Sequence, residues 1–388
     1  MTFNLCWHNM KKKKFFITTT LAQTLFFFKG QPRIWKEEYD VYAIAAERDR
    51  LIEFAQGEGI GYYYMPLKRE ISFLSDLLCL FRFVVLFVRE RPLVVHGNTP
   101  KASMLSMLAA WLTFRPVRIY MCHGLRYQTE SGFLRRFLMA MEWLSCHCAT
   151  KVISVSNGVK EQLIKDGLCP RHNGMVVHYG TAGGVNVEFF SRESTECVNQ
   201  IDEVIPENAF TFSFIGRMVS DKGINELVSA ADRLINEKEN ICLLLIGPFE
   251  KSLSPLKEET LNTIQRNPRI IVCGPQKDIR PYLAKSDAFV LPSYREGVGQ
   301  VLLEASCMDV PCIASDIIGC NEVVLPGYNG ELVPPKDEEA LYQKMKEWLN
   351  NTVKVKQMSK RSRELIVSRY AQKDVWQAYW QVYKSFLN

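Results

Sequence analysis

Short apolar segments alternate with amphipathic segments along the whole chain, and this alternation restricts the possible folds more than any other feature. The expected strands of the first half are Phe15–Thr20, Val41–Ala45, Tyr62–Met65, Leu93–His96, Val117–Cys122, Val152–Val155 and Met175–His178. Those of the second half are Phe210–Ile215, Cys242–Ile246, Ile270–Cys273, Ala288–Leu291 and Pro311–Ala314. Between them, stretches such as Ile224–Asn236 and Ala340–Leu349 carry apolar residues at helical spacing. Strand, helix and strand repeated in this way predict an α/β fold with parallel sheets.

The two series of strands are separated by the polar segment Ser191–Glu207, which predicts two doubly wound, Rossmann-like domains. At roughly 150 residues per domain, the chain is long enough for two hydrophobic cores. We expect residues 1–190 to form the first domain and residues 191–373 the second, with a last helix at 374–388 packing back on the first. Ligands of such sheets bind beyond the carboxyl ends of the strands, so the expected site is the cleft between two facing domains.

The net charge of +6 is unevenly distributed. Residues 1–190 contain 24 Lys and Arg against 15 Asp and Glu, a net charge of +9, whereas residues 191–388 contain 24 against 27, a net charge of −3. A basic half beside a mildly acidic half indicates that the first half meets an anionic partner. Nucleic acid, a membrane surface and a phosphorylated substrate all fit this distribution.

The N-terminal segment has some features of a secretion signal, because Lys11–Lys14 precede the apolar run Phe15–Phe28. Threonine and glutamine side chains dilute that run, however, and no small-x-small cleavage site follows it. β-Branched and aromatic residues in this pattern are typical of a buried strand. We therefore expect a cytoplasmic chain whose first strand begins at Phe15, after a disordered leader at residues 1–10.

The apolar run Phe73–Val88 is interrupted by Asp76 and Arg82 and is shorter than the ~20 residues that a membrane-spanning helix needs. Basic residues flank it on both sides, from Lys68 to Arg91. Two interpretations remain open: a buried core helix, or a helix that lies on an anionic membrane surface.

The segment Arg295–Ala305 carries the strongest chemical signal. It follows the expected strand Ala288–Leu291, and its two glycines permit close approach of the backbone to a ligand just before a helix begins. Amides at a helix N-terminus bind phosphate. Glu296 precedes the helix and Glu304 lies about two turns inside it, so one carboxylate suits the sugar of a nucleotide-sugar and the other its ribose hydroxyls. The alternative is a loop with solvated glutamates.

A second segment, Gly216–Gly223, also follows an expected strand and leads into a helix. Its Arg217 and Lys222 would supply positive charge that offsets a diphosphate leaving group. The alternative is two ordinary surface cations.

At these residues the second half resembles the retaining, nucleotide-sugar-dependent glycosyltransferases of family 4, which have the two-lobed GT-B fold. The Glu-x7-Glu pattern falls on Glu296 and Glu304, the Gly-Arg and Lys-Gly pairs fall within Gly216–Gly223, and Val310–Val324 resembles the segment that usually follows. The resemblance implies that the donor contacts Gly216, Gly297, Val298, Gly299, Gln300 and Glu304, with the base near Gly274.

The first half resembles, more loosely, bacterial enzymes that extend lipid-linked sugars for capsule, O-antigen or glycan assembly. The segments that carry this likeness are Phe27–Gln31, Val95–Lys101 and Cys122–Tyr127. The resemblance implies that His123 acts near the donor sugar and that Lys101 and Arg126 bind an acceptor pyrophosphate. The glycine pair that many members carry in the first strand-to-helix loop is absent from Thr20–Gln23, so contacts inferred from that pair do not carry over.

No Asp-x-Asp motif occurs, and the clustered cysteines of Cys146-His147-Cys148 lack a second pair of zinc ligands, so we expect no metal and no cofactor. The resemblance implies metal-independent, front-face transfer with retention, in which Glu296 positions sugar hydroxyls and no side chain is the nucleophile.

The expected reaction moves a hexosyl or N-acetylhexosaminyl group from a UDP-linked donor to a polyprenyl-diphosphate-linked sugar, on the cytoplasmic face of the inner membrane. The expected partners are these substrates and an anionic membrane surface, not nucleic acid. The alternatives are a transferase with a soluble acceptor, a nucleotide-sugar epimerase of the same architecture, and a nucleotide-sugar-binding regulatory protein without turnover.

Overall fold

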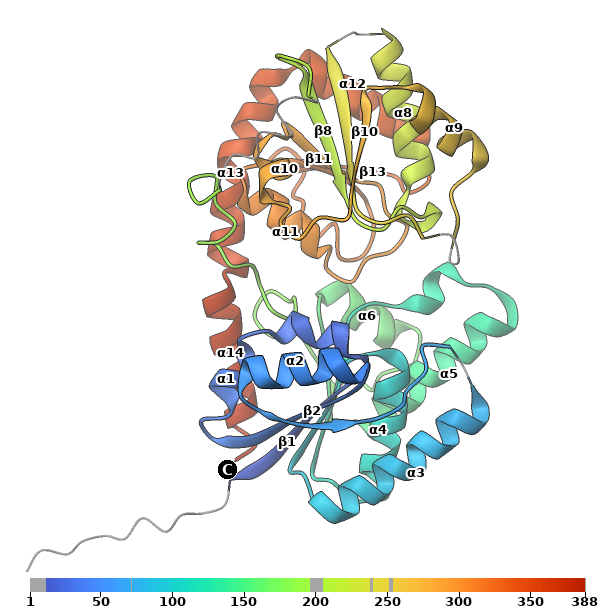
Figure 1. The fold of residues 1–388 in the computed structure, drawn as a ribbon, viewed down its shortest axis with the longest axis vertical. Coiled ribbons are helices and arrows are strands. Elements are labelled where there is room, and N and C mark those ends of the chain that lie inside the picture. The colour runs from blue at the N-terminus through green and yellow to red at the C-terminus, as the bar shows by residue number, and fades with distance from the viewer. Residues whose placement is uncertain (1–11, 71, 196–204, 238–239, 251–253, 388) are drawn as a thin grey trace, which may run out of the picture.

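The computed structural model describes residues 12–70, 72–195, 205–237, 240–250 and 254–387. Their strands form two parallel sheets, one above the other along the long axis of the molecule (Figure 1). This confirms the predicted α/β architecture. The expected leader at residues 1–10 and much of the polar segment between the two series of strands, 196–204, lie outside the described residues.

The first sheet has seven strands in the order β3-β2-β1-β4-β5-β6-β7. Its strands are β1 (Lys13–Leu21), β2 (Tyr39–Ala46), β3 (Gly61–Tyr64), β4 (Val94–Gly97), β5 (Val117–Cys122), β6 (Lys151–Ser154) and β7 (Gly174–Met175). Strand β1 pairs in parallel with both β2 and β4, and its residues Phe15–Thr20 are buried. The first part of the apolar N-terminal run, up to Leu21, is therefore a central strand, as its β-branched and aromatic residues predict, and the rest forms a 3-10 helix, η1 (Ala22–Phe28).

The second sheet has six strands in the order β10-β9-β8-β11-β12-β13. They are β8 (Phe210–Ile215), β9 (Ile241–Ile246), β10 (Ile270–Gly274), β11 (Ala288–Leu291), β12 (Cys312–Ser315) and β13 (Gly330–Val333). Strand β13 was not expected, because a glycine and a glutamate occupy half of its four positions and leave no apolar run to recognise.

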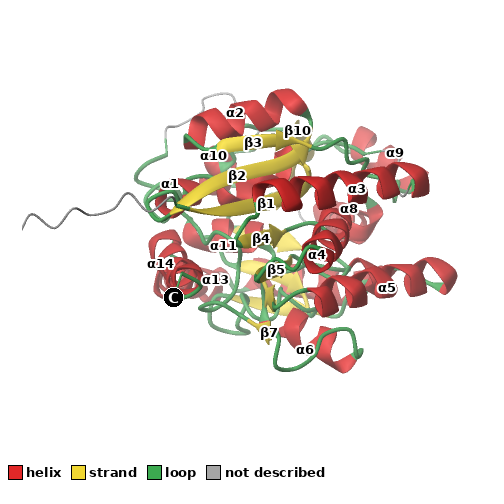
Figure 2. Cartoon of the chain, turned by 90° about the horizontal axis from the view of Figure 1, so that it is seen from below, coloured by secondary structure: helices red, strands yellow, loops and turns green. Residues whose placement is uncertain are grey.

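Helices α3 (Phe73–Glu90), α4 (Pro100–Leu112) and α5 (Gly132–Cys148) gather on one side of the first sheet, and α1 (Gln31–Trp35) lies on the other (Figure 2). The remaining helical elements described in this domain are η1 (Ala22–Phe28), α2 (Arg48–Glu58), η2 (Arg126–Thr129) and α6 (Asn157–Lys165). Those of the second domain are η3 (Ser220–Lys222), α8 (Ile224–Glu237), α9 (Glu258–Arg266), α10 (Arg280–Ala284), α11 (Gln300–Cys307), α12 (Glu338–Asn350) and α13 (Thr352–Tyr370).

The last helix, α14 (Gln372–Lys384), lies against the first domain beside α1 (Figure 1). Tyr39 donates a hydrogen bond to the Tyr383 carbonyl (2.6 Å), and the Tyr383 hydroxyl lies 3.0 Å from Nε2 of His96. These three side chains are fully buried. The chain therefore crosses between the domains a second time, from α13 to α14, and this crossing links the second domain to the first.

Candidate active site

The loop after β5 of the first domain contacts the loop after β11 of the second domain. A Cβ added to Gly297, in the second domain, would overlap the carbonyl oxygen of His123 in the first. Gly124 lies opposite as well, with its own Cβ position 3.5 Å from Cα of Gly297. Gly319, at φ +86°, packs its backbone on the Gly297 carbonyl from the other side. Glycine is thus needed at Gly297 for the two domains to approach this closely.

Two polar contacts set how the domains face each other. Glu322 of the second domain accepts hydrogen bonds from the amides of Asn157 (2.8 Å) and Gly158 (2.7 Å), in the first turn of α6. A carboxylate is favoured there, because exposed amides make a helix N-terminus positive. Gln300 donates to the Gly184 carbonyl (3.0 Å), on the crossover between the domains. The Gln300 side chain is therefore engaged in holding the crossover.

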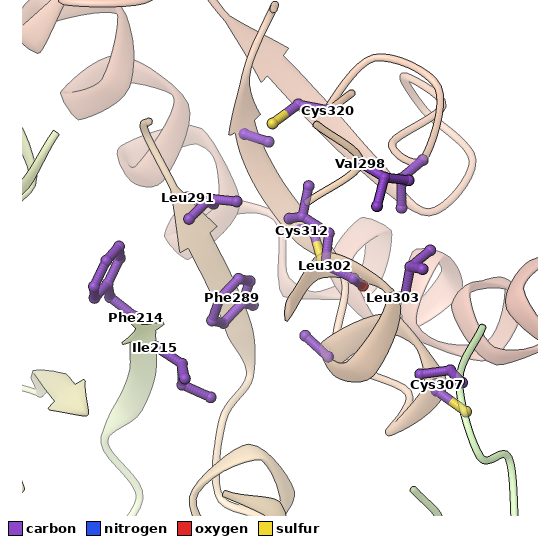
Figure 3. Close-up of a cluster of buried hydrophobic side chains, with 14 of the residues drawn as sticks. Phe214, Ile215, Phe289, Leu291, Val298, Leu302, Leu303, Cys307, Cys312 and Cys320 are labelled. Atoms are coloured by element: carbon purple, nitrogen blue, oxygen red, sulfur yellow. The ribbon is translucent and has the colours of Figure 1, made fainter. Parts of the chain in front are cut away.

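The glycine-rich loop before α11 presents the N-terminus of that helix. Gly299 has φ +58°, the left-handed conformation that glycine adopts most easily, and α11 begins at the next residue. Figure 3 shows Leu302 and Leu303 of this helix among the buried side chains of the neighbouring strands. Val298 is only 9% exposed in the same cluster, so it would meet a donor through its backbone rather than its side chain.

Glu304 lies in the helix that follows this loop. Gln300 Nε2 is 3.4 Å from its Oε1, and burial raises the pKa of the Glu304 carboxyl to about 7. The long hydrogen bond from Gln300 stabilises the charge of this carboxyl only partly, and two ribose hydroxyls would supply further hydrogen bonds. The position therefore suits the ribose contact expected from the sequence.

The expected cations of the leaving-group site each pair with a carboxylate. Lys222 Nζ lies 2.5 Å from Oε1 of Glu296, and both side chains are largely buried. Arg217 lies 2.6 Å from Glu250, whose pKa it lowers. Arg69 of the first domain approaches the other oxygen of Glu250 at 3.6 Å. The structure thus brings Lys222 and Glu296 into direct contact.

The loop bearing Lys222 is held against the loop bearing Glu296. Gly223, at φ +72°, packs so closely on the Pro292 carbonyl that a Cβ would overlap it. Tyr294 N donates to the Asp221 carbonyl (2.9 Å), two residues from Glu296. The ion pair therefore rests on a rigid backbone framework.

His123 lies at the end of β5, where its ring is 6.2 Å from the rings of Phe27 and Phe28. Burial lowers the pKa of this imidazole to about 4, so it is neutral near pH 7 and offers one N–H donor. Gly274, expected near the base, ends β10 with no atom within 4 Å of its Cβ position.

A pocket of about 840 Å³ opens beside these residues and is lined by both domains. It contains five basic side chains, Arg69, Arg126, Arg217, Arg295 and Lys336, and its other lining residues are Glu70, Thr129, Glu130, Asp221, Ser254 and Tyr294. Arg126 and Arg217 were expected at the site; Arg69, Arg295 and Lys336 were missed. Arg295 adjoins Glu296 in sequence, which could have revealed it.

Lys101, expected at an acceptor pyrophosphate, is 6% exposed and does not line this pocket. Its ammonium pairs with Asp76 at 2.8 Å and also bonds the Glu70 carbonyl. Lys101 therefore supports the segment that carries Arg69 and Glu70, whereas Arg126 faces the pocket itself.

Two glycosyltransferase family models match this chain, one in each half. The family described as "Glycosyltransferase Family 4" matches residues 33–181, and "Glycosyl transferases group 1" matches residues 199–365. The chain belongs to glycosyltransferase family 4. This confirms the enzyme class predicted from the sequence.

Relatives of this family 4 glycosyltransferase include two bacterial enzymes. It is 28% identical over 379 residues to the capsular polysaccharide biosynthesis glycosyltransferase CapM of Staphylococcus aureus, which covers 97% of this chain and 98% of that protein. It is 26% identical over 342 residues to the UDP-Gal:alpha-D-GlcNAc-diphosphoundecaprenol alpha-1,3-galactosyltransferase of Escherichia coli, covering 86% of each chain. Among solved structures, Anabaena HepE in complex with UDP and glucose superposes with a TM-score of 0.80 at 17% identity, covering 96% of this chain and 100% of that one. That likeness confirms the GT-B fold.

Proposed function

We propose that this glycosyltransferase transfers a hexosyl or N-acetylhexosaminyl group, with retention, from a UDP-linked sugar to a sugar carried on a polyprenyl diphosphate. The product would enter a capsule or another surface glycan. The relative from Escherichia coli is named for UDP-galactose and a diphosphoundecaprenol acceptor, and CapM is named for capsular polysaccharide, which supports both parts of the proposal.

The observation that carries the proposal is the basic pocket between the domains. Its five cations come from both domains, and two of them, Arg69 and Arg126, belong to the first. A donor diphosphate needs the second-domain cations Arg217 and Lys222. The first-domain cations, Arg126 and the more loosely paired Arg69 (3.6 Å from Glu250), can then bind a second anionic group. A sugar on a diphosphate carrier has such a group, whereas a neutral soluble sugar does not.

We infer the donor's place from the elements around α11. The amides at the N-terminus of α11 and the cations Arg217 and Lys222 face the diphosphate, Glu304 accepts from the ribose, and the base lies near Gly274. The diphosphate would compete with Glu250 and Glu296 for their cations. This competition loosens both ion pairs and leaves Glu296 able to accept from sugar hydroxyls.

The chemical step needs no protein nucleophile. The bond from the anomeric carbon to the phosphate oxygen breaks with its electron pair leaving on UDP, through an oxocarbenium-like transition state as in other glycosyl transfer. The acceptor hydroxyl forms its bond on the same face, and its proton passes to the departing phosphate. Arg217 and Lys222 stabilise the charge that develops on UDP.

The test incubates the protein with a panel of UDP-, GDP- and dTDP-sugars and a short-chain polyprenyl-diphosphate sugar. Release of nucleoside diphosphate and the mass of the lipid-linked product are followed together. Acceptor-dependent release of UDP, with one sugar added to the lipid, would support the proposal. Conversion of the donor into its epimer, binding without release, or addition only to a soluble sugar would contradict it.

A further inference from the structure

Helix α3 presents a continuous apolar surface to solvent. Its exposed apolar side chains, here called the α3 stripe, are Phe73, Leu74, Leu77, Leu78, Phe81, Val85 and Val88. At about 100° of rotation per residue, all seven fall within an arc of about 140°. The buried residues of the helix, Cys79, Phe83, Leu86 and Phe87, lie on the opposite side and pack toward the domain. Of the two interpretations open for this segment, a fully buried core helix is therefore wrong.

The stripe is unusual for a surface helix. Phe73 and Leu74 are 82% and 85% exposed, and Phe133, at the start of α5, is 83% exposed. Folded monomers seldom expose so many large apolar side chains together unless they bind something. In both views α3 and α5 lie on the same side of the first domain, away from α1 and α14 (Figures 1 and 2).

The charges around the stripe are mainly positive. Arg82 and Arg89 lie along one flank of α3, and Arg135 and Arg136 are exposed on α5. The acidic residues of α3 are both neutralised: Asp76 pairs with Lys101, and Glu90 contacts Lys14. Arg89 also pairs with Glu90 at 2.8 Å, and all four arginines remain exposed to solvent. An apolar face bordered by exposed arginines complements the interface of an anionic bilayer, where the apolar groups enter the acyl boundary and the cations meet lipid phosphates.

The stripe also adjoins the basic pocket. Arg69 and Glu70 line that pocket a few residues before α3 begins, and Arg126 and Thr129 line it just before α5. The pocket thus lies near the N-terminal ends of the two helices that expose Phe73, Leu74 and Phe133. A diphosphate in the pocket would have its hydrocarbon chain at the level of the stripe.

We propose that the α3 stripe, with the N-terminal turn of α5, lies on the surface of an anionic membrane and positions the basic pocket over its lipid-linked acceptor. The role of this contact in presenting the acceptor rests on the proposed function, whereas binding of the stripe to a membrane does not. Among the described residues, no helix is both long and apolar enough to cross a bilayer, so the expected contact is interfacial.

The experiment measures co-sedimentation of the protein with vesicles of phosphatidylglycerol and phosphatidylcholine, without donor or acceptor. The variant combines Leu74→Ser, Leu77→Ser and Phe81→Ser. A matched control combines Leu261→Ser, Val353→Ser and Val367→Ser, which removes three exposed apolar side chains from the second domain. We expect at least ~10-fold weaker partitioning of the stripe variant, no change for the control, and weaker wild-type binding to pure phosphatidylcholine or at high salt.

Several results would overturn the proposal. They are no wild-type binding to anionic vesicles, equal binding of the stripe variant, or a wild-type dimer in light scattering that the stripe variant converts to a monomer without losing vesicle binding. Turnover on a short-chain acceptor is measured in parallel. Loss of vesicle binding with turnover retained supports the docking surface, whereas vesicle binding without turnover on any donor would contradict the proposed function alone.

Discussion

The backbone of Gly297 and the carbonyl oxygen of His123 are in such close contact across the cleft that any side chain at residue 297 would overlap that oxygen. We therefore expect Gly297→Ala to push the two loops apart and lower kcat/KM at least ~10-fold, because a small displacement of positioned groups is costly for catalysis. Initial rates at saturating donor and varied acceptor concentration measure this kcat/KM. The control is Gly57→Ala in α2, where nothing lies near the added Cβ and activity should be unchanged. Equal activity of the two variants would contradict the tight contact.

Donor binding should depend on the ionisation of Glu304. Burial raises the pKa of this carboxyl to about 7, and ribose hydroxyls donate to its ionised form, so UDP affinity should rise with pH. Between pH 6 and pH 8 the ionised fraction increases from about 10% to about 90%, which predicts a gain of up to about ninefold. Calorimetric titration with UDP measures it.

Glu304→Gln serves as the control for this profile. The phosphate of UDP also titrates near pH 6, and it does so equally in both proteins, so the difference between them isolates the carboxyl. The variant should bind UDP more weakly at pH 8, by about 1.5–3 kcal/mol if one charged hydrogen bond is lost. Parallel pH profiles would remove Glu304 from the donor site.

Lys222→Ala should reduce kcat more than it weakens donor binding, because its charge matters most when the diphosphate departs. Loss of one such group costs about 100-fold or more in kcat. Lys222→Arg keeps the charge beside Glu296 and should recover part of the activity. Rapid-quench measurement of the transfer step separates the two effects, and an increase in donor KM with unchanged kcat would contradict the assignment.

Arg126→Ala and Arg69→Ala should both raise KM for a diphosphate-linked acceptor, and Arg126→Ala should leave KM for the UDP-sugar unchanged. Both side chains line the pocket from the first domain, whereas the donor residues belong to the second. The acceptor KM of the wild type should also rise with salt. Arg361→Ala on α13, an exposed arginine outside the pocket, is the control. An unchanged acceptor KM in both pocket variants would place the acceptor elsewhere.

Activity should survive treatment with a chelator. The chain lacks an Asp-x-Asp motif, and Arg217 and Lys222 can supply the positive charge that such a motif supplies through a metal ion. Initial rates before and after dialysis against EDTA measure this. Loss of activity that magnesium or manganese restores would show that the leaving group needs a metal.

Much of the fold follows from local patterns in the sequence. Val117–Cys122, Phe210–Ile215 and Ala288–Leu291 were predicted with their observed bounds, because each is a mainly apolar run that ends at polar residues, glycine or proline. Strand β13 has no such run. Strand β13 forms because it pairs with β12 in the folded sheet. Such a long-range contact cannot be recognised from the residues of the segment alone.

The candidate site was predicted in part. Glu296 and Lys222 stand out because each lies in a glycine-containing loop between a strand and a helix, and the structure brings them together. The basic pocket could not be predicted, since Arg69 and Lys336 are distant in sequence and meet only when the domains face each other. Lys101 shows the converse: its partner Asp76 precedes it by 25 residues, and no local pattern indicates that pairing.

The most direct test of the central claim compares two acceptors that carry the same sugar and the same short prenyl chain, with and without the diphosphate. The account predicts at least ~100-fold higher kcat/KM for the diphosphate form, because cations of the first domain bind it. It also predicts that Arg126→Ala reduces this preference. Equal kcat/KM for the two acceptors in the wild type would contradict the account.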